Sequence, residues 1–98
     1  MENTVYLELL RRGYDVSIGK VEALEVDFVA TNPTGTSYYQ VAATVRDETT
    51  LERELRSLQK IRDNYPKYIL TLDEEPDCDF DGIHKMNVLK WLSQGRRP

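Results

Sequence analysis

Three oxygen-bearing side chains, Glu2, Asp27 and Gln40, have types and spacing that suit a metal site. Glu2 begins a predicted helix, Asp27 lies within a predicted strand, and Gln40 lies in the next strand, so a hairpin would place the last two side by side. Hard divalent cations such as Mg²⁺ prefer small groups of oxygen ligands. A structural interpretation is equally open, in which Asp27 is a polar-face residue and Gln40 is a cross-strand partner satisfied by hydrogen bonds.

The elements that would position these residues follow from hydrophobic periodicity. Helical spacing predicts helices over 2–12, from 47 to the residue before Pro66, and over 86–92. Alternating or apolar runs predict strands over 14–18, 24–30, 37–45 and 68–72, with a last short strand beginning at 82–84. The expected fold is therefore a single α/β domain over residues 1–98, with the order α-β-β-β-α-β-(β)-α and a mixed sheet of four or five strands flanked by helices.

Finer features of these elements can also be predicted. Gly19–Lys20 is expected to form a turn after the first strand. In the second strand, Leu24, Val26, Phe28 and Ala30 are expected to share one face. Either Thr49, paired with Glu52, or Asp47 is expected to cap the second helix. The segment 73–81 holds six acids in nine residues and is expected to be a solvated loop.

Composition excludes several classes of protein. Seventeen acidic against thirteen basic residues give a net charge of −4, which disfavours a free-standing nucleic-acid binder. The single cysteine, Cys78, cannot form an intramolecular disulfide, so a reducing, cytoplasmic location is expected. No apolar run approaches the roughly 18 residues that a membrane span needs, and no leader is evident, so no membrane partner is expected.

Several segments resemble a known superfamily. The stretches ENTVYLELLRRGYDV, KVEALEVDFVA, YYQVAATV and LERELRSLQKIRDNYPKYILTLD, with DGIHKMNVLKWL near the end, are similar to C-terminal domains of unknown function in bacterial and archaeal AAA-type ATPases. These domains belong to the PD-(D/E)XK, or restriction-endonuclease-like, superfamily. The resemblance covers nearly the whole chain and implies a fragment of a longer ATP-binding protein. The phosphate-binding spacing G-x-x-x-x-G-K-[ST] does not occur in this sequence, so the resemblance places ATP hydrolysis elsewhere in the parent protein.

The resemblance implies a vestigial site at Glu2, Asp27, Gln40 and Ala42. Glu2 matches the helix acid and Asp27 the strand acid, but Gln40-Val41-Ala42 stands where the superfamily has Glu-x-Lys. In metal-assisted cleavage the carboxylates hold the ion and the ammonium activates water or stabilises negative charge, so the loss of both groups predicts a domain without catalysis. Cleavage would require another lysine to replace the missing one, and Lys20 and Lys60 are the candidates.

Three hypotheses follow. The first is a non-catalytic accessory domain that needs no cofactor and contacts other domains of the parent ATPase, a second copy or another protein. The second is a metal-dependent DNA nuclease that uses Glu2, Asp27 and Gln40 with Mg²⁺. The third is a DNA-binding pseudo-nuclease, which requires a basic groove despite the net charge.

Other motifs are expected to be structural. The run 77–82 copies the opening of a calcium-binding loop, but Val88 stands where the bidentate Glu is required. Cys78 and His84 have no visible orienting partner, so they do not predict a nucleophile and its base. Tyr38, Tyr39, Tyr65 and Tyr68 could stack on bases, but their spacing favours core and rim positions.

Overall fold

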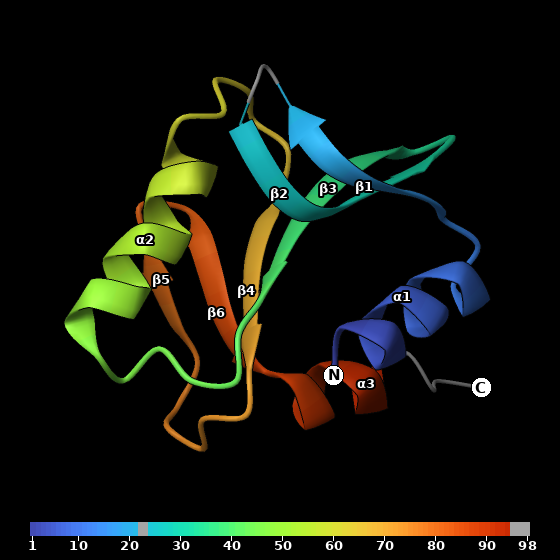
Figure 1. The fold of residues 1–98 in the computed structure, drawn as a ribbon. Helices are drawn as coiled ribbons and strands as arrows, with labels where there is room; N and C mark the ends of the chain where they lie inside the picture. Colours follow the sequence, from blue (N-terminus) through green and yellow to red (C-terminus); the bar gives the residue numbers. More distant parts are fainter. Residues whose placement is uncertain (22–23, 95–98) are drawn as a thin grey trace.

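The computed structural model describes residues 1–21 and 24–94. The fold of this part is mixed α and β, with three helices separated along the chain by two runs of three strands (Figure 1). In chain order the elements are α1 (Glu2–Arg11), β1 (Asp15–Val21), β2 (Leu24–Asn32), β3 (Gly35–Val41), α2 (Glu48–Gln59), β4 (Lys67–Thr71), β5 (Cys78–Phe80), β6 (Ile83–Asn87) and α3 (Val88–Gln94). None of the helices in residues 1–21 and 24–94 is long and apolar enough to cross a membrane.

The strands form one six-stranded mixed sheet with the order β1-β2-β3-β4-β6-β5. The pairs β1–β2, β2–β3 and β5–β6 are antiparallel, whereas β3–β4 and β4–β6 are parallel. Helix α2 covers one face of the sheet, and α1 and α3 lie on the other face (Figure 1). The sequence predicted the mixed sheet and the placement of helices on its faces, but not the sixth strand.

Identifiable residues fix the start of α2 and the end of α1. Asp47 caps α2, because its carboxylate accepts a hydrogen bond of 3.3 Å from the Thr50 N–H. The helix ends at Gln59, well before Pro66, which the sequence had predicted as its limit. Helix α1 ends before Gly13, whose φ of +91° is a left-handed conformation typical of glycine after a helix.

Each face of the sheet has its own apolar core. The core under α2 contains Val26, Tyr38, Val45, Leu58, Ile61, Ile69 and Ile83. The core under α1 and α3 contains Val5, Leu9, Phe28, Ala30, Tyr39, Val41, Leu70, Val88 and Trp91. The buried positions of Tyr38 and Tyr39 agree with the prediction that they are core residues.

The side chain of Arg12, the residue that follows α1, links α1 to α3. Its Nε donates to Glu8 Oε2 at 2.7 Å, and its Nη2 donates to the Trp91 carbonyl at 2.6 Å. The guanidinium carbon lies 4.1 Å from the centroid of the Trp91 ring, which adds a cation–π contact. Arg11 bonds the same Glu8 carboxylate at 2.9 and 2.7 Å. The first and last helices are therefore joined by a charged, half-buried network.

The predicted face assignment of β2 holds for Phe28 and Ala30 but is wrong for Val26, and the side chain of Leu24 lies outside the described residues. Val26 packs in the core under α2, whereas Phe28 and Ala30 pack under α1 and α3. The cause is a register shift, since Ser17 pairs with Val29 but Gly19 pairs with Val26, which leaves one extra residue in β2. A bulge of this kind moves all following side chains to the other face of the sheet.

The predicted turn at Gly19–Lys20 is also wrong. Strand β1 continues through these residues to Val21. Gly19 adopts a φ of +128°, a conformation that side-chain-bearing residues rarely take, and it lies beside the register shift. The glycine therefore permits the irregularity within the strand rather than ending it.

The acidic segment 73–81 is not a uniformly solvated loop. Asp73 is 2% exposed, and residues Cys78–Phe80 form strand β5. Asp81 and Gly82, with φ values of 52° and 89°, make the tight turn into β6, where both central residues need positive φ. The acids of the apparent calcium loop have separate partners, since Asp77 pairs with Lys90 and Asp79 with His84.

The last helix begins later than predicted. Met86 and Asn87 belong to β6, and α3 starts at Val88. Asn87 Oδ1 accepts hydrogen bonds from the N–H groups of Leu89 at 2.8 Å and Lys90 at 3.2 Å, so Asn87 caps α3. The strand-to-helix transition is therefore fixed by the asparagine.

Candidate functional site

The strands β2 and β3 separate at Asp27 and Gln40. Their regular pairing ends at Phe28 and Tyr39. Beyond it, the Asp27 N–H donates to Gln40 Oε1 at 2.7 Å, and the Val41 N–H donates to Asp27 Oδ2 at 2.8 Å. Side chains thus replace the backbone acceptors where the ladder ends. The Gln40 amide oxygen thus makes a cross-strand hydrogen bond, as the structural interpretation of this residue expects.

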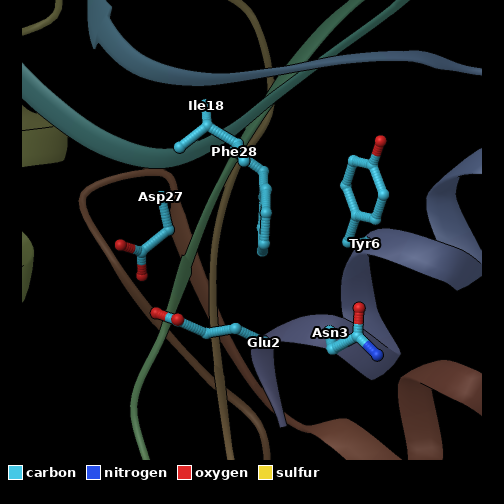
Figure 2. Close-up of a pocket in the computed structure, with 6 residues that line it drawn as sticks. All are labelled: Glu2, Asn3, Tyr6, Ile18, Asp27 and Phe28. Carbon is cyan, nitrogen blue, oxygen red and sulfur yellow. The ribbon is translucent and has the colours of Figure 1, made fainter.

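Glu2 comes to the same place from the first turn of α1. Figure 2 shows its carboxylate directed toward that of Asp27, across the mouth of an open cavity. The cavity has a volume of about 380 Å³ and is lined by Glu2, Asn3, Tyr6, Ile18, Asp27 and Phe28. Two of the four residues predicted for the site, Glu2 and Asp27, therefore line one hollow, with Gln40 bonded behind them.

A third carboxylate, Glu54, was not predicted from the sequence. Burial raises the pKa of Glu54, and the charges of Asp27 and Glu2 raise it further, so the three acids interact electrostatically. Glu54 is half-buried in α2, three residues after Leu51 and four before Leu58, on the apolar stripe of that helix. An acid within such a stripe is the sequence signal that would have identified it.

The electrostatics of the site are those of acids near one another. Burial raises the pKa of Asp27, the Glu2 carboxylate raises it further, and the Val41 N–H opposes both effects. Burial likewise raises the pKa of Glu54, with Arg53 as the opposing charge. A lysine ammonium beside Asp27 would lower its pKa instead. Among the described residues, the cavity therefore places two acidic groups, Glu2 and Asp27, beside each other.

Among the lysines whose side chains are described, Lys67 and Lys90 pair with other acids, and no lysine is among the charges that shift the pKa of Asp27. Ala42 offers only a methyl group beside Val41. Lys67 donates to Asp63 Oδ1 and to the Tyr65 carbonyl, each at 2.9 Å, at the start of β4. Lys60 is exposed at the end of α2. The side chain of Lys20, the other candidate substitute, lies outside the described residues.

A metal centre is not assembled in the described part of the chain. Within residues 1–21 and 24–94, no three His, Cys, Asp or Glu side chains are grouped closely enough to hold a metal ion. Of the predicted ligands, Gln40 already directs its amide oxygen to the Asp27 N–H at 2.7 Å. As they stand, Glu2 and Asp27 can accept charge-assisted hydrogen bonds from a cationic group that enters the cavity.

Comparison with known proteins adds one relative. The chain is 39% identical over 94 residues to an uncharacterized protein of Haemophilus influenzae. The match covers 96% of this chain but 23% of the relative, so the chain spans about a quarter of that protein's length. The sequence matches no protein-family model.

His84 has an orienting partner that the sequence did not reveal. Its Nδ1 hydrogen-bonds to Asp79 Oδ1 across the β5–β6 pair, and its ring lies 5.5 Å from that of Tyr68. Cys78 is exposed on β5, the strand that carries Asp79.

The ring of Tyr39 stacks on that of Tyr68 with a centroid separation of 4.9 Å. These tyrosines are occupied by packing against one another.

Proposed function

We propose that this chain is a restriction-endonuclease-like domain that does not cleave DNA and acts as a protein-interaction module of a longer, AAA-type ATP-binding protein. The elements α1, β1, β2, β3, α2 and β4 occur in the order predicted from hydrophobic periodicity for the proposed fold. Their four strands are neighbours in one mixed sheet, with helices on both faces. This agreement of element order supports the proposed fold family.

The observation that carries the absence of cleavage is the bonding of Gln40. Its amide oxygen accepts from the Asp27 N–H at 2.7 Å, and the Asp27 carboxylate accepts from the Val41 N–H at 2.8 Å. Metal-assisted cleavage requires a set of anionic ligands and a group that activates water. Here Gln40 offers a neutral amide whose oxygen is already bonded to the Asp27 N–H. Ala42 stands where the superfamily has the lysine that activates water, and it has no charged group.

The length of the relative supports the idea of a module. The matched segment makes up 23% of the Haemophilus influenzae protein, so in that protein the equivalent domain is joined to a much larger remainder. A domain of this size within a longer chain commonly acts by contact with its neighbours. The partner proposed here is another domain or subunit of the parent protein.

A cleavage assay tests the loss of activity. Supercoiled plasmid is incubated with the purified chain and either Mg²⁺ or Mn²⁺, with Asp27→Ala as the matched control. We expect both proteins to leave the plasmid intact. Metal-dependent nicking that disappears in Asp27→Ala would overturn the proposal in favour of a nuclease.

A binding assay tests the interaction role. The chain is mixed with the remainder of the parent protein and analysed by sedimentation velocity, with the chain alone as reference. We expect a complex with the remainder. No complex, together with a duplex-DNA affinity that falls steeply with salt, would instead indicate a DNA-binding pseudo-nuclease.

The metal-dependent nuclease remains the second candidate because of Glu54. This acid supplies an anionic oxygen in the neighbourhood of Glu2 and Asp27, and its pKa responds to both. A divalent ion bound by the three carboxylates would offset the repulsion between their negative charges. The cleavage assay with Mn²⁺ discriminates this candidate from the inactive module.

A further inference from the structure

The cavity beside Asp27 is an apolar groove with an acidic mouth. Ile18, on the edge strand β1, is 75% exposed at its wall. The rings of Tyr6 and Phe28 lie with centroids 6.1 Å apart and form the adjacent surface. Figure 2 shows the Glu2 and Asp27 carboxylates facing each other at one side of these rings. The groove thus offers apolar contact and negative charge within one volume of about 380 Å³.

We propose that this groove binds an arginine side chain of a protein partner. This inference rests on the proposed role as an interaction module and names the surface that the module uses. The N–H groups of the guanidinium would donate hydrogen bonds to the carboxylates of Glu2 and Asp27. The aliphatic stem would lie against Phe28 and Ile18.

Charge complementarity identifies the occupant. The two acids that line the groove, Glu2 and Asp27, face each other there, and burial together with the charge of Glu2 raises the pKa of Asp27, so a cation in the groove would stabilise the ionised form of both acids. Arginine suits the site better than lysine because its planar fork bonds two carboxylates at once and stacks on aromatic rings. It suits the site better than a bare metal ion because half of the lining residues are apolar or aromatic side chains.

None of the described lysines pairs with the carboxylates of Glu2 and Asp27, so both can bind a cation from a partner. The sequence resemblance places a lysine at residue 42, where this chain has alanine. The side chains of Lys60 and Lys67 are placed elsewhere, as described above. A partner arginine would supply from outside the positive charge that the chain does not place beside Asp27 from its described residues.

The test is a titration followed by nuclear magnetic resonance. The ¹⁵N,¹³C-labelled chain is titrated with N-acetyl-arginine amide, and the uncharged isostere N-acetyl-citrulline amide serves as the ligand control. We expect saturable shifts at the Ile18 methyl groups and at the Asp27 and Phe28 amides with the arginine probe. The citrulline probe should produce no saturable shift there.

Two variants test the carboxylates. Asp27→Asn keeps an oxygen that can accept from the Val41 N–H, so the local backbone bond is preserved. We expect Asp27→Asn and Glu2→Gln each to weaken arginine binding by about tenfold, which corresponds to about 1.4 kcal/mol. Glu52→Gln removes the same charge from an exposed position of α2 and should leave the affinity unchanged.

Each other result overturns the inference. Equal shifts with the citrulline probe would show that charge is not recognised, and unchanged affinity in Asp27→Asn would place the arginine elsewhere. Millimolar Mn²⁺ that broadens Asp27 and Glu54 while the arginine probe produces no shift would assign a metal site. If the arginine probe fails but the complex with the parent protein still forms, this groove is the wrong surface while the interaction role stands.

Discussion

The backbone of Asp27 and the side chain of Gln40 are joined by a hydrogen bond of 2.7 Å from the Asp27 N–H to Gln40 Oε1. This bond orients the amide at the point where β2 and β3 separate. Because an amide is neutral, it accepts the bond without adding a second negative charge beside the Asp27 carboxylate. Gln40 therefore adds a hydrogen-bond acceptor to the site without adding charge.

Restoring the superfamily pattern at this point should restore metal binding. In Gln40→Glu/Ala42→Lys, the new carboxylate supplies an anionic ligand and the new ammonium balances the added charge. We expect calorimetry to show Mn²⁺ binding at least about tenfold tighter than in the natural chain, since a carboxylate replaces an amide ligand. The same double variant carrying Asp27→Ala is the control. Equal Mn²⁺ affinities in the natural chain and the restored variant would contradict this assignment of the site.

Ionisation of Asp27 should oppose folding. Its folded-state pKa lies above the ordinary value of 3.8, so stability is gained as pH falls through the folded pKa and is lower above it. We expect Asp27→Asn to be at least as stable as the natural chain at pH 7 and to lose this pH dependence. Urea unfolding between pH 3 and pH 7 measures the difference, and a variant that is less stable at pH 7 would contradict the sign.

Glu8 should behave in the opposite way. Hydrogen bonds from Arg11, opposed by burial and assisted by Arg12, lower the pKa of Glu8 from 4.5 to about 2. Its stabilisation is therefore present above about pH 4.5 and lost as pH falls toward 2. We expect Glu8→Gln to lower the free energy of unfolding by about 1–3 kcal/mol at pH 7, since hydrogen bonds to a charged group are lost.

The measurement for Glu8 is chemical denaturation of both proteins at pH 7 and at pH 2.5. The gap between them should narrow at the lower pH because the natural glutamate becomes protonated. Arg11→Gln, on the exposed side of the pair, should have a smaller effect, since its side chain is 53% exposed against 9% for Glu8. A gap that stays constant with pH would show that packing, not charge, stabilises this helix junction.

Asp73 should be a structural residue despite its place in an acidic segment. Its Oδ2 accepts from the Val45 N–H at 2.9 Å. Burial would raise its pKa, but the Thr44 hydroxyl, the Val45 N–H and the charge of Arg46 together lower it. We expect Asp73→Ala to lower the free energy of unfolding by about 1–3 kcal/mol, because the Val45 N–H is left buried without an acceptor.

The matched control for Asp73 is Asp77→Ala in the same segment. Asp77 is paired with Lys90 at 2.8 Å, but both side chains are at least a third exposed. Exposed pairs of this kind contribute little, so we expect a change within about 0.5 kcal/mol. Thermal or urea unfolding of the two variants compares them directly, and equal effects would show that burial does not distinguish the two acids.

Much of the fold followed from periodicity. The apolar stripe of α2, with Leu51, Leu55 and Leu58, predicted a helix packed on a sheet, and the alternating strands predicted that Asp27 and Gln40 would be neighbours. Both features depend on interactions between residues close in sequence or joined by a short turn. Such local patterns are readable because they repeat at the period of the element.

The features that the sequence did not predict are tertiary. The switch of Val26 to the α2 side depends on an extra residue in β2, which is defined only by pairing with β1. The burial of Asp73 depends on Val45, 28 residues away. Glu54 escaped notice because its relation to Asp27 requires α2 to lie over β2. A single alternating pattern carries none of these relations.

Because Arg12 links α1 to α3, the groove beside α1 depends on the order of the last helix. Its bond to the Trp91 carbonyl joins residues 79 positions apart, and the same α1 carries Glu2 at its first turn. Unfolding of α3 would remove the Trp91 contacts of Arg12 and so weaken the packing of α1, which carries Glu2, while Asp27 stayed in the sheet. Occupancy of the groove and the order of the final helix should consequently rise and fall together, so that a ligand at one end of the chain protects amides at the other from solvent exchange.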